Sequence, residues 1–78
     1  MKITITKSDI RKGKRGNYRK CFMALGTHRA TKKECYVTLD RVRIGRDWYD
    51  LPEVARCAIS DGDLGHPVQP FSFDLPVL

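Results

Sequence analysis

The sequence predicts a small α+β domain of two layers, in which a mainly antiparallel sheet of about four strands carries two helices on one face. Alternating apolar and polar residues near both ends of the chain indicate strands, and apolar residues at helical spacing between them indicate helices. Two further strands, over residues 42–44 and 48–51, are joined by a connection that is too short for a parallel crossover. Because about 60% of the surface of so short a chain can be buried on folding, we expect one core and a single domain over residues 1–78.

The first 20 residues predict a strand, a helical turn and a loop. Residues 2–6 alternate in polarity and are mostly β-branched, which is typical of a half-buried strand. Thr6 or Ser8 can cap a helical turn over residues 9–12, and Gly13 can end it. Residues 12–20 combine clustered Lys and Arg with two glycines and one tyrosine. We expect an exposed loop there, either a solvated connector or a loop that contacts phosphates while Tyr18 stacks on a base.

Residues 20–30 predict the helix around which the extended segments pack. Cys21, Ala24, Leu25 and His28 follow the spacing of one helical face and are expected to point into the core. Arg29 and the lysines at both ends of the helix are then left to solvent. The same helix would therefore anchor the fold and display cations.

The middle of the chain predicts three strands and a second helix. Apolar residues occupy odd positions over residues 35–39 and even positions at 42 and 44, so a tight turn or a bulge is required near residues 40–41. Residues 45–47 are suited to a hairpin connection. Pro52 is suited to the first turn of a helix that should end near residues 61–62. The alternation over residues 71–75 predicts a final edge strand whose aromatic side covers the core.

Charge is divided unevenly along the chain. Residues 1–46 hold 14 of the 15 Lys and Arg and only three acids, whereas residues 47–78 hold six acids and one Arg, for a net charge of +6 overall. This asymmetry fits two situations: either one half of the chain binds a polyanion, or the two halves attract each other within the fold.

Candidate reactive groups are few. The three cysteines and two histidines do not have the spacing of zinc ligands, so we expect no metal and reduced thiols. Cys21 lies beside cations near a helix start, but it is interpreted as a small buried residue because no base is near it in sequence. His66 with Asp61 and Asp63 lacks a nucleophile, and residues 13–16 lack the context of a phosphate loop. We therefore predict no catalytic residue and no enzyme. We also assign Trp48 to the core or its rim rather than to an exposed aromatic patch with Tyr36.

Several short motifs together suggest a relationship. They are Ile3-Thr4-Ile5-Thr6, Asp9-Ile10 followed by Gly13, Cys21 with Ala24, Leu51-Pro52 and Pro70-Phe71-Ser72-Phe73. In this respect the chain resembles small accessory proteins of phages and prophages, although Phe22 and Gly26 replace the Pro and Ala of their usual central helix. The resemblance brings no specific activity. It implies a phage product of a class that includes inhibitors of host defence such as anti-CRISPR proteins.

Two functions from different classes fit these patterns. In the first, a non-enzymatic accessory protein uses its basic N-terminal part to contact nucleic acid, or a host ribonucleoprotein or defence complex, and inhibits it. The expected contact residues are Lys12, Lys14, Arg15, Tyr18, Arg19, Lys20, Arg29, Lys32 and Lys33. In the second, a protein-interaction module occludes a host protein through its acidic C-terminal part or the strand edge near Phe71 and Phe73.

The expected setting follows from what the sequence lacks. No apolar run approaches the ~18 residues of a membrane span, and no signal-peptide pattern opens the chain. We expect a protein of the host bacterium's cytoplasm, with no membrane partner, no cofactor and no small-molecule substrate. It should be a monomer or a weak homodimer.

Overall fold

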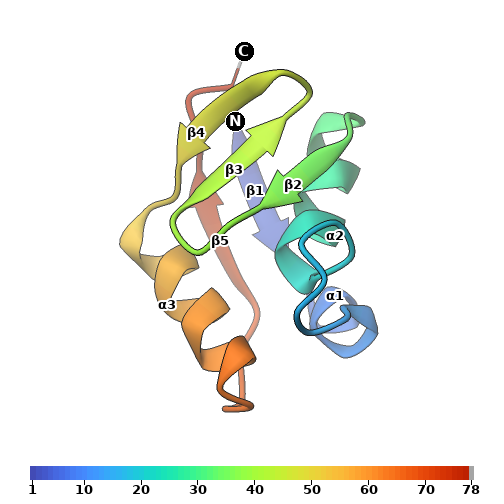
Figure 1. Ribbon diagram of the computed structural model, residues 1–78, viewed down its shortest axis with the longest axis vertical. Coiled ribbons are helices and arrows are strands. Elements are labelled where there is room, and N and C mark those ends of the chain that lie inside the picture. Colours follow the sequence, from blue (N-terminus) through green and yellow to red (C-terminus); the bar gives the residue numbers. More distant parts are fainter. Residues whose placement is uncertain (78) are drawn as a thin grey trace.

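The first and last strands pair with each other, although they are far apart in the sequence. In the computed structural model, which describes residues 1–77, β1 (Lys2–Ile5) runs antiparallel to β5 (Phe71–Asp74), with Ile3 opposite Phe73. Alternation places Ile3, Ile5 and Phe73 in the core and leaves polar side chains outside. The N-terminus consequently lies beside the segment after β5 (Figure 1), where the ammonium group of Met1 donates to the carbonyl of Leu75 at 2.6 Å.

The second sheet is built from consecutive hairpins. It contains β2 (Cys35–Val37), β3 (Arg41–Ile44) and β4 (Asp47–Asp50) in that order, all antiparallel. The expected tight turn before β3 is present: the backbone N–H of Thr38 donates to the carbonyl of Arg41 at 2.8 Å. Gly45, with a φ of 63°, forms the turn between β3 and β4, a conformation that suits glycine. Of the two alternatives expected near residues 40–41, the tight turn is present, and the hairpin connection predicted at residues 45–47 is confirmed.

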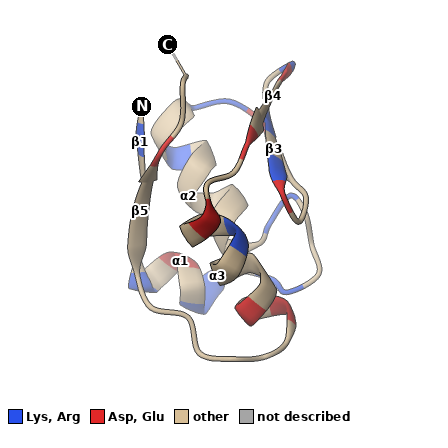
Figure 2. Cartoon of the chain, turned by 90° about the vertical axis from the view of Figure 1, so that its left-hand side faces the viewer, with Lys and Arg blue, Asp and Glu red and all other residues tan. Residues whose placement is uncertain are grey.

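Two of the helices lie between the two sheets. Figure 1 shows the three-stranded sheet in front of β1 and β5, and the perpendicular view in Figure 2 shows α2 (Phe22–Thr31) and α3 (Glu53–Asp63) between these outer layers. The core gathers apolar side chains from all of these elements, chiefly Ile3, Ile5, Met23, Ala24, Val37, Val42, Ile44, Ala55, Ile59 and Phe73. Among the described residues, no helix has the length and apolar character needed to cross a membrane.

The short helix α1 (Lys7–Lys12) begins with a complete capping box. The hydroxyl of Thr6 accepts a hydrogen bond from the N–H of Asp9 at 3.2 Å, and the Asp9 carboxylate accepts one from the N–H of Thr6 at 2.9 Å. The same carboxylate accepts two bonds of 2.7 Å from the guanidinium of Arg29 on α2. Arg29 also donates to the carbonyl of Thr4 at 2.9 Å. The Asp9–Arg29 pair thus ties β1, α1 and α2 together.

The prediction of which face of the central helix, α2, is buried was wrong in part. Ala24 is buried as expected, but His28 is exposed and Cys21 precedes the first helical residue. Met23, Gly26 and Thr27 face the core instead. The physical reason is close packing at Gly26: a Cβ there would overlap the side chain of Ile5 and lie 3.2 Å from the carbonyl oxygen of Thr4. The face of α2 that carries Gly26 therefore packs against β1.

The predicted α+β class is confirmed, whereas its layering differs from the expectation. The described residues form five strands in two sheets and three helices, not one sheet of about four strands with two helices on one face. The strands between residues 35 and 50 pair locally through tight turns, so β1 and β5 have only each other as partners. The two short sheets bury one face each by closing over the same helices.

Candidate nucleic-acid interface

The outward face of the three-stranded sheet carries aromatic and cationic side chains. Because side chains alternate along a strand, Val42 and Ile44 of β3 are buried and Arg41 and Arg43 point outwards. The two-residue turn after Ile44 sets the register of β4, so that Trp48 lies opposite Arg43.

A row of three side chains crosses this face. Tyr36 on β2, Arg43 on β3 and Trp48 on β4 are direct cross-strand neighbours. The rings of Tyr36 and Trp48 meet edge to face with centroids 6.3 Å apart, and the guanidinium carbon of Arg43 lies 5.8 Å from the centroid of the Tyr36 ring. The Trp48 side remains open to solvent, since the residue is 47% exposed.

A second arginine adjoins the row. The guanidinium carbon of Arg41 lies 5.7 Å from the centroid of the Trp48 ring. Asp50 faces Arg41 in the strand register, but within residues 1–77 neither Arg41 nor Arg43 is engaged in an ion pair. The Nε atom of Arg43 is buried without a hydrogen-bond partner among these residues. The cations of this face are therefore held by aromatic rings rather than neutralised by carboxylates.

Tyr18 extends the row beyond the edge of the sheet. Its ring centroid is 5.5 Å from that of Tyr36, and it is 53% exposed. The carbonyl of Tyr18 accepts a hydrogen bond of 3.0 Å from the N–H of Val37, so the loop attaches to the open edge of β2. We call the set formed by Tyr18, Tyr36, Trp48, Arg41 and Arg43 the aromatic–arginine face.

We call residues 13–20, between α1 and α2, the basic loop. Hydrogen bonds within this loop fix the position of Tyr18. The side-chain oxygen of Asn17 accepts bonds of 3.1 Å from the N–H groups of both Arg19 and Lys20. The N–H of Lys14 donates to the carbonyl of Lys20 at 2.9 Å, which closes the loop at its base. The loop predicted from its glycines and charges is present, and hydrogen bonds between its own residues hold its conformation.

The nine residues predicted to contact nucleic acid fall into different environments. Lys12 ends α1, and the loop after it carries Lys14, Arg15, Tyr18, Arg19 and Lys20. Lys32 caps the C-terminal end of α2 with a left-handed backbone, and the stem of Lys33 lies near the turn at Gly45. Of the nine, only Tyr18 belongs to the aromatic–arginine face.

Two of the predicted contact residues are already paired within the protein. Both terminal nitrogens of the Arg29 guanidinium bond to Asp9, and this pairing lowers the pKa of Asp9 below its ordinary value. Arg19 forms a 3.4 Å ion pair with Glu34, in which both side chains are largely exposed. An exposed pair of this kind contributes little and can exchange for a phosphate, whereas the Arg29 pair closes the fold. We therefore leave Arg29 out of the candidate interface.

Sequence reasoning missed four of the five residues of the aromatic–arginine face. The expectation that Trp48 belongs to the core or its rim was wrong, since Trp48 is exposed; Tyr49, opposite the buried Val42, points inwards instead. The sequence did contain a signal for this face: Val42 and Ile44 alternate with two arginines, and a two-residue turn follows. Counting pairs back from that turn places Trp48 beside Arg43.

The thiols and histidines of the described residues lie in different environments. Burial raises the pKa of the Cys21 thiol, although the backbone N–H groups of Ala24 and Met23 oppose this, and burial also raises the pKa of Cys35. Protonated thiols are weak nucleophiles. His66 lies 3.7 Å from Asp61 in an exposed pair, and no group of His, Cys, Asp and Glu within residues 1–77 could hold a metal ion.

Comparison with known proteins gives no relative: no family model, no curated protein and no solved structure matches this chain.

Proposed function

We propose that this protein is a non-enzymatic binding module that holds single-stranded nucleic acid on its aromatic–arginine face. The observation that carries the proposal is the row of neighbouring rings of Tyr18, Tyr36 and Trp48, exposed at both ends, with two arginines against its rings. Unpaired bases stack on aromatic rings and arginine planes, and their phosphates attract cations.

A single strand fits this surface better than a duplex. Neighbouring strands of a sheet are about 4.8 Å apart, so a row over three strands and the adjoining Tyr18 offers room for about two or three bases. The aromatic rings can stack only on bases that are not already stacked inside a double helix. Among residues 1–77 no helix projects from this face (Figure 1), and an α-helix is an element that fits a major groove.

The surrounding charges favour a polyanion at this face. The basic loop contains Tyr18, and Lys33 lies beside the turn that joins β3 to β4. Asp50 on β4 is the acid that faces Arg41 in the strand register, and three other acids of the C-terminal half lie on α3 (Figure 2). Phosphates that flank the stacked bases would meet Arg41, Arg43 and the loop cations.

The resemblance to phage accessory proteins extends this proposal to a partner. A phage accessory protein that acts on a host ribonucleoprotein could use the same face to grasp an exposed segment of its RNA. The protein-interaction alternative differs in one respect that can be measured: it requires no affinity for naked strands.

Fluorescence anisotropy with a labelled mixed-sequence strand of about 12 nucleotides tests the proposal. Trp48→Ala should weaken binding by roughly 1–3 kcal/mol, which is about fivefold to a hundredfold, because it removes one stacking platform. Val54→Ala is the matched control, since Val54 is 48% exposed but lies on α3, and it should leave the affinity unchanged. Equal affinities for both variants, or tighter binding of a duplex than of its separate strands, would contradict the proposal.

A further inference from the structure

A cavity opens beside the aromatic–arginine face. It has a volume of about 270 Å³ and lies between the basic loop, the start of α2, the turn after β2 and the end of α3 with the segment that follows it. Most of its lining is apolar, with Phe22, Val37, Leu39 and Ile59 among the residues that contribute. The volume is slightly below the ~300 Å³ at which pockets for drug-sized molecules begin, so it suits a group of the size of one nucleobase.

Tyr18 connects the cavity with the aromatic–arginine face. It lines the cavity, and its ring lies 5.5 Å from Tyr36, the next member of the row. A strand that stacks along the row therefore reaches the mouth of the cavity at its Tyr18 end. The backbone bond between Tyr18 and Val37 keeps these two surfaces in a fixed relation.

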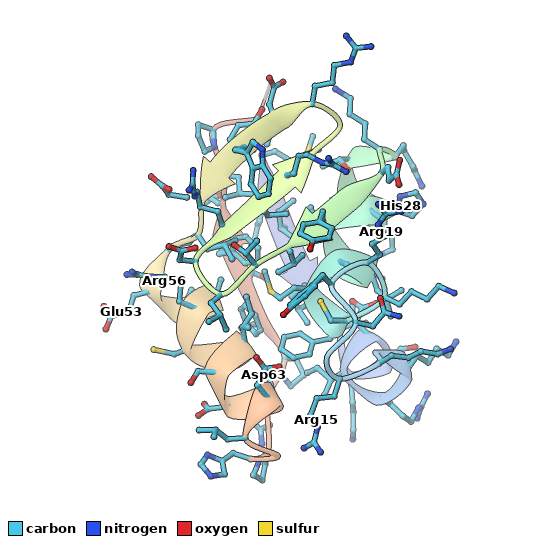
Figure 3. The ribbon with its side chains drawn as sticks, in the orientation of Figure 1. Arg15, Arg19, His28, Glu53, Arg56 and Asp63 are labelled. Atoms are coloured by element: carbon cyan, nitrogen blue, oxygen red, sulfur yellow. The ribbon has the colours of Figure 1, made fainter. Side chains whose placement is uncertain are left out.

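The polar groups at the cavity are arranged for a base and its phosphate. Lys14 and Arg15 contribute to the lining from the basic loop, and the guanidinium of Arg15 lies against Gly65. Asp63, at the end of α3, is a further lining residue, and Figure 3 shows it pointing from α3 towards the middle of the molecule. Within the described residues Asp63 forms no ion pair. Asp63 is exposed, so its carboxylate is free to accept hydrogen bonds from a ligand in the cavity.

We infer that this cavity takes one base of the bound strand and that Asp63 makes it selective for guanine; this inference rests on the proposed function. Guanine is the base that offers two adjacent donors, N1–H and the 2-amino group, to the two oxygens of one carboxylate. The apolar walls cover the faces of the ring, and Lys14 and Arg15 receive the flanking phosphate. Splayed single-stranded bases are commonly recognised in this way, by hydrogen bonds to their Watson–Crick edge.

The test compares strands that differ at one base in each repeat. Anisotropy is measured with a thymine-only strand of about 12 nucleotides and with strands in which every third base is guanine or hypoxanthine. Wild-type protein should bind the guanine strand about tenfold more tightly than the thymine strand, since a bidentate pair discriminates by that order. The hypoxanthine strand, which lacks the 2-amino donor, should fall between them.

Two variants, each lacking one carboxylate, show which residue causes the guanine preference. Asp63→Ala should abolish the guanine preference and leave the affinity for the thymine strand unchanged or slightly higher. Asp61→Ala removes the same charge from the same helix at an exposed position outside the cavity lining, and it should keep the preference. Both variants should fold, because acids in the last turn of a helix oppose its dipole and their removal is not destabilising on that account.

The outcomes separate this inference from the proposed function. Thymine and guanine strands that bind wild-type protein equally well, or an unchanged guanine preference in Asp63→Ala, would overturn the inference while the aromatic–arginine face stands. Loss of binding to every strand would overturn both. Amide chemical shifts give a second readout: Gly62, Asp63 and Gly65 should shift with the guanine strand and not with the thymine strand.

Discussion

At the scale of single residues, Asp9 shows how one buried carboxylate can organise several elements. It is 5% exposed, completes the capping box of α1 and accepts two hydrogen bonds from Arg29. The sequence indicated only that an acid at this position stabilises the start of a helix. The partner lies 20 positions away, and no periodicity links the two residues, so the pairing follows from the packing of α2 on β1.

Replacement of Arg29 should destabilise the fold without touching the aromatic–arginine face. Arg29→Ala should lower the free energy of unfolding by about 2 kcal/mol, because it leaves the buried Asp9 carboxylate without its main partner. We keep the value below that of a fully buried pair, since the Arg29 side chain is 48% exposed and screened. Urea denaturation measures the loss, and Arg11→Ala, at an exposed position on α1, should change stability by less than about 0.5 kcal/mol.

The effect of the Asp9 pair should disappear in acid. Hydrogen bonds from Arg29, and to a smaller extent from Thr6, hold the pKa of Asp9 below its ordinary value of 3.8. A lowered folded-state pKa stabilises the protein above the unfolded value, and the contribution is lost as the pH falls through the folded value. The difference in stability between wild type and Arg29→Ala should therefore be full at neutral pH and shrink below pH 3.8. An equal difference at neutral pH and at about pH 2 would contradict this assignment.

At the scale of elements, close approach explains why α2 has its glycine in the core. A side chain at Gly26 would overlap Ile5 and approach the carbonyl oxygen of Thr4, so the helix and β1 pack backbone against backbone. The apolar residue Leu25 is only partly buried as a result. Hydrophobic periodicity predicts which residues avoid water, but it does not predict where two backbones must meet.

A larger residue at position 26 should therefore be costly. Gly26→Val should lower the free energy of unfolding by about 2–3 kcal/mol through overpacking, even though valine has the better helix propensity. Ser60→Val on α3 is the control, since the same branched side chain at an exposed helical position should change stability by less than about 0.5 kcal/mol. Thermal or urea unfolding followed by circular dichroism measures both. A Gly26→Val variant as stable as wild type would mean that α2 can move away from β1 freely.

At the scale of the whole molecule, the cations are distributed over several elements rather than gathered by the N-terminal half on one side. Figure 2 shows them on α1, α2, β1 and β3, while acids mark α3 and β4. The net charge of +6 favours approach to any polyanion, whereas the aromatic–arginine face combines arginines with the exposed rings of Tyr18 and Trp48. Long-range attraction and local recognition are therefore separate properties of this protein.

The salt dependence of binding should separate these two properties. Each phosphate contact on a single strand contributes about −0.7 to the slope of log affinity against log salt concentration. Arg41→Ala should make the slope shallower by about that amount, because Arg41 lies beside Trp48. Arg56→Ala removes the same charge from α3, where Figure 3 shows the side chain pointing away from the molecule, and it should keep the wild-type slope. Identical slopes for the two variants would place the strand elsewhere.

The sequence by itself determined the α+β class, most strand and helix positions, the capped turn before Gly13 and the exposure of the basic loop. These features depend on local propensity and on neighbours a few residues away, which are written directly in the chain. The resemblance to phage accessory proteins stays a prediction, as does the oligomeric state.

Only the tertiary structure decided the division into two sheets, the buried face of α2 and the composition of the aromatic–arginine face. Each of these depends on pairs such as Ile3 with Phe73, Asp9 with Arg29 or Tyr18 with Tyr36, whose members are distant in sequence. The physical reason is that a short chain has only one core to share. Which side of each element reaches that core, and which side is left to bind, is settled by how all the elements close over it together.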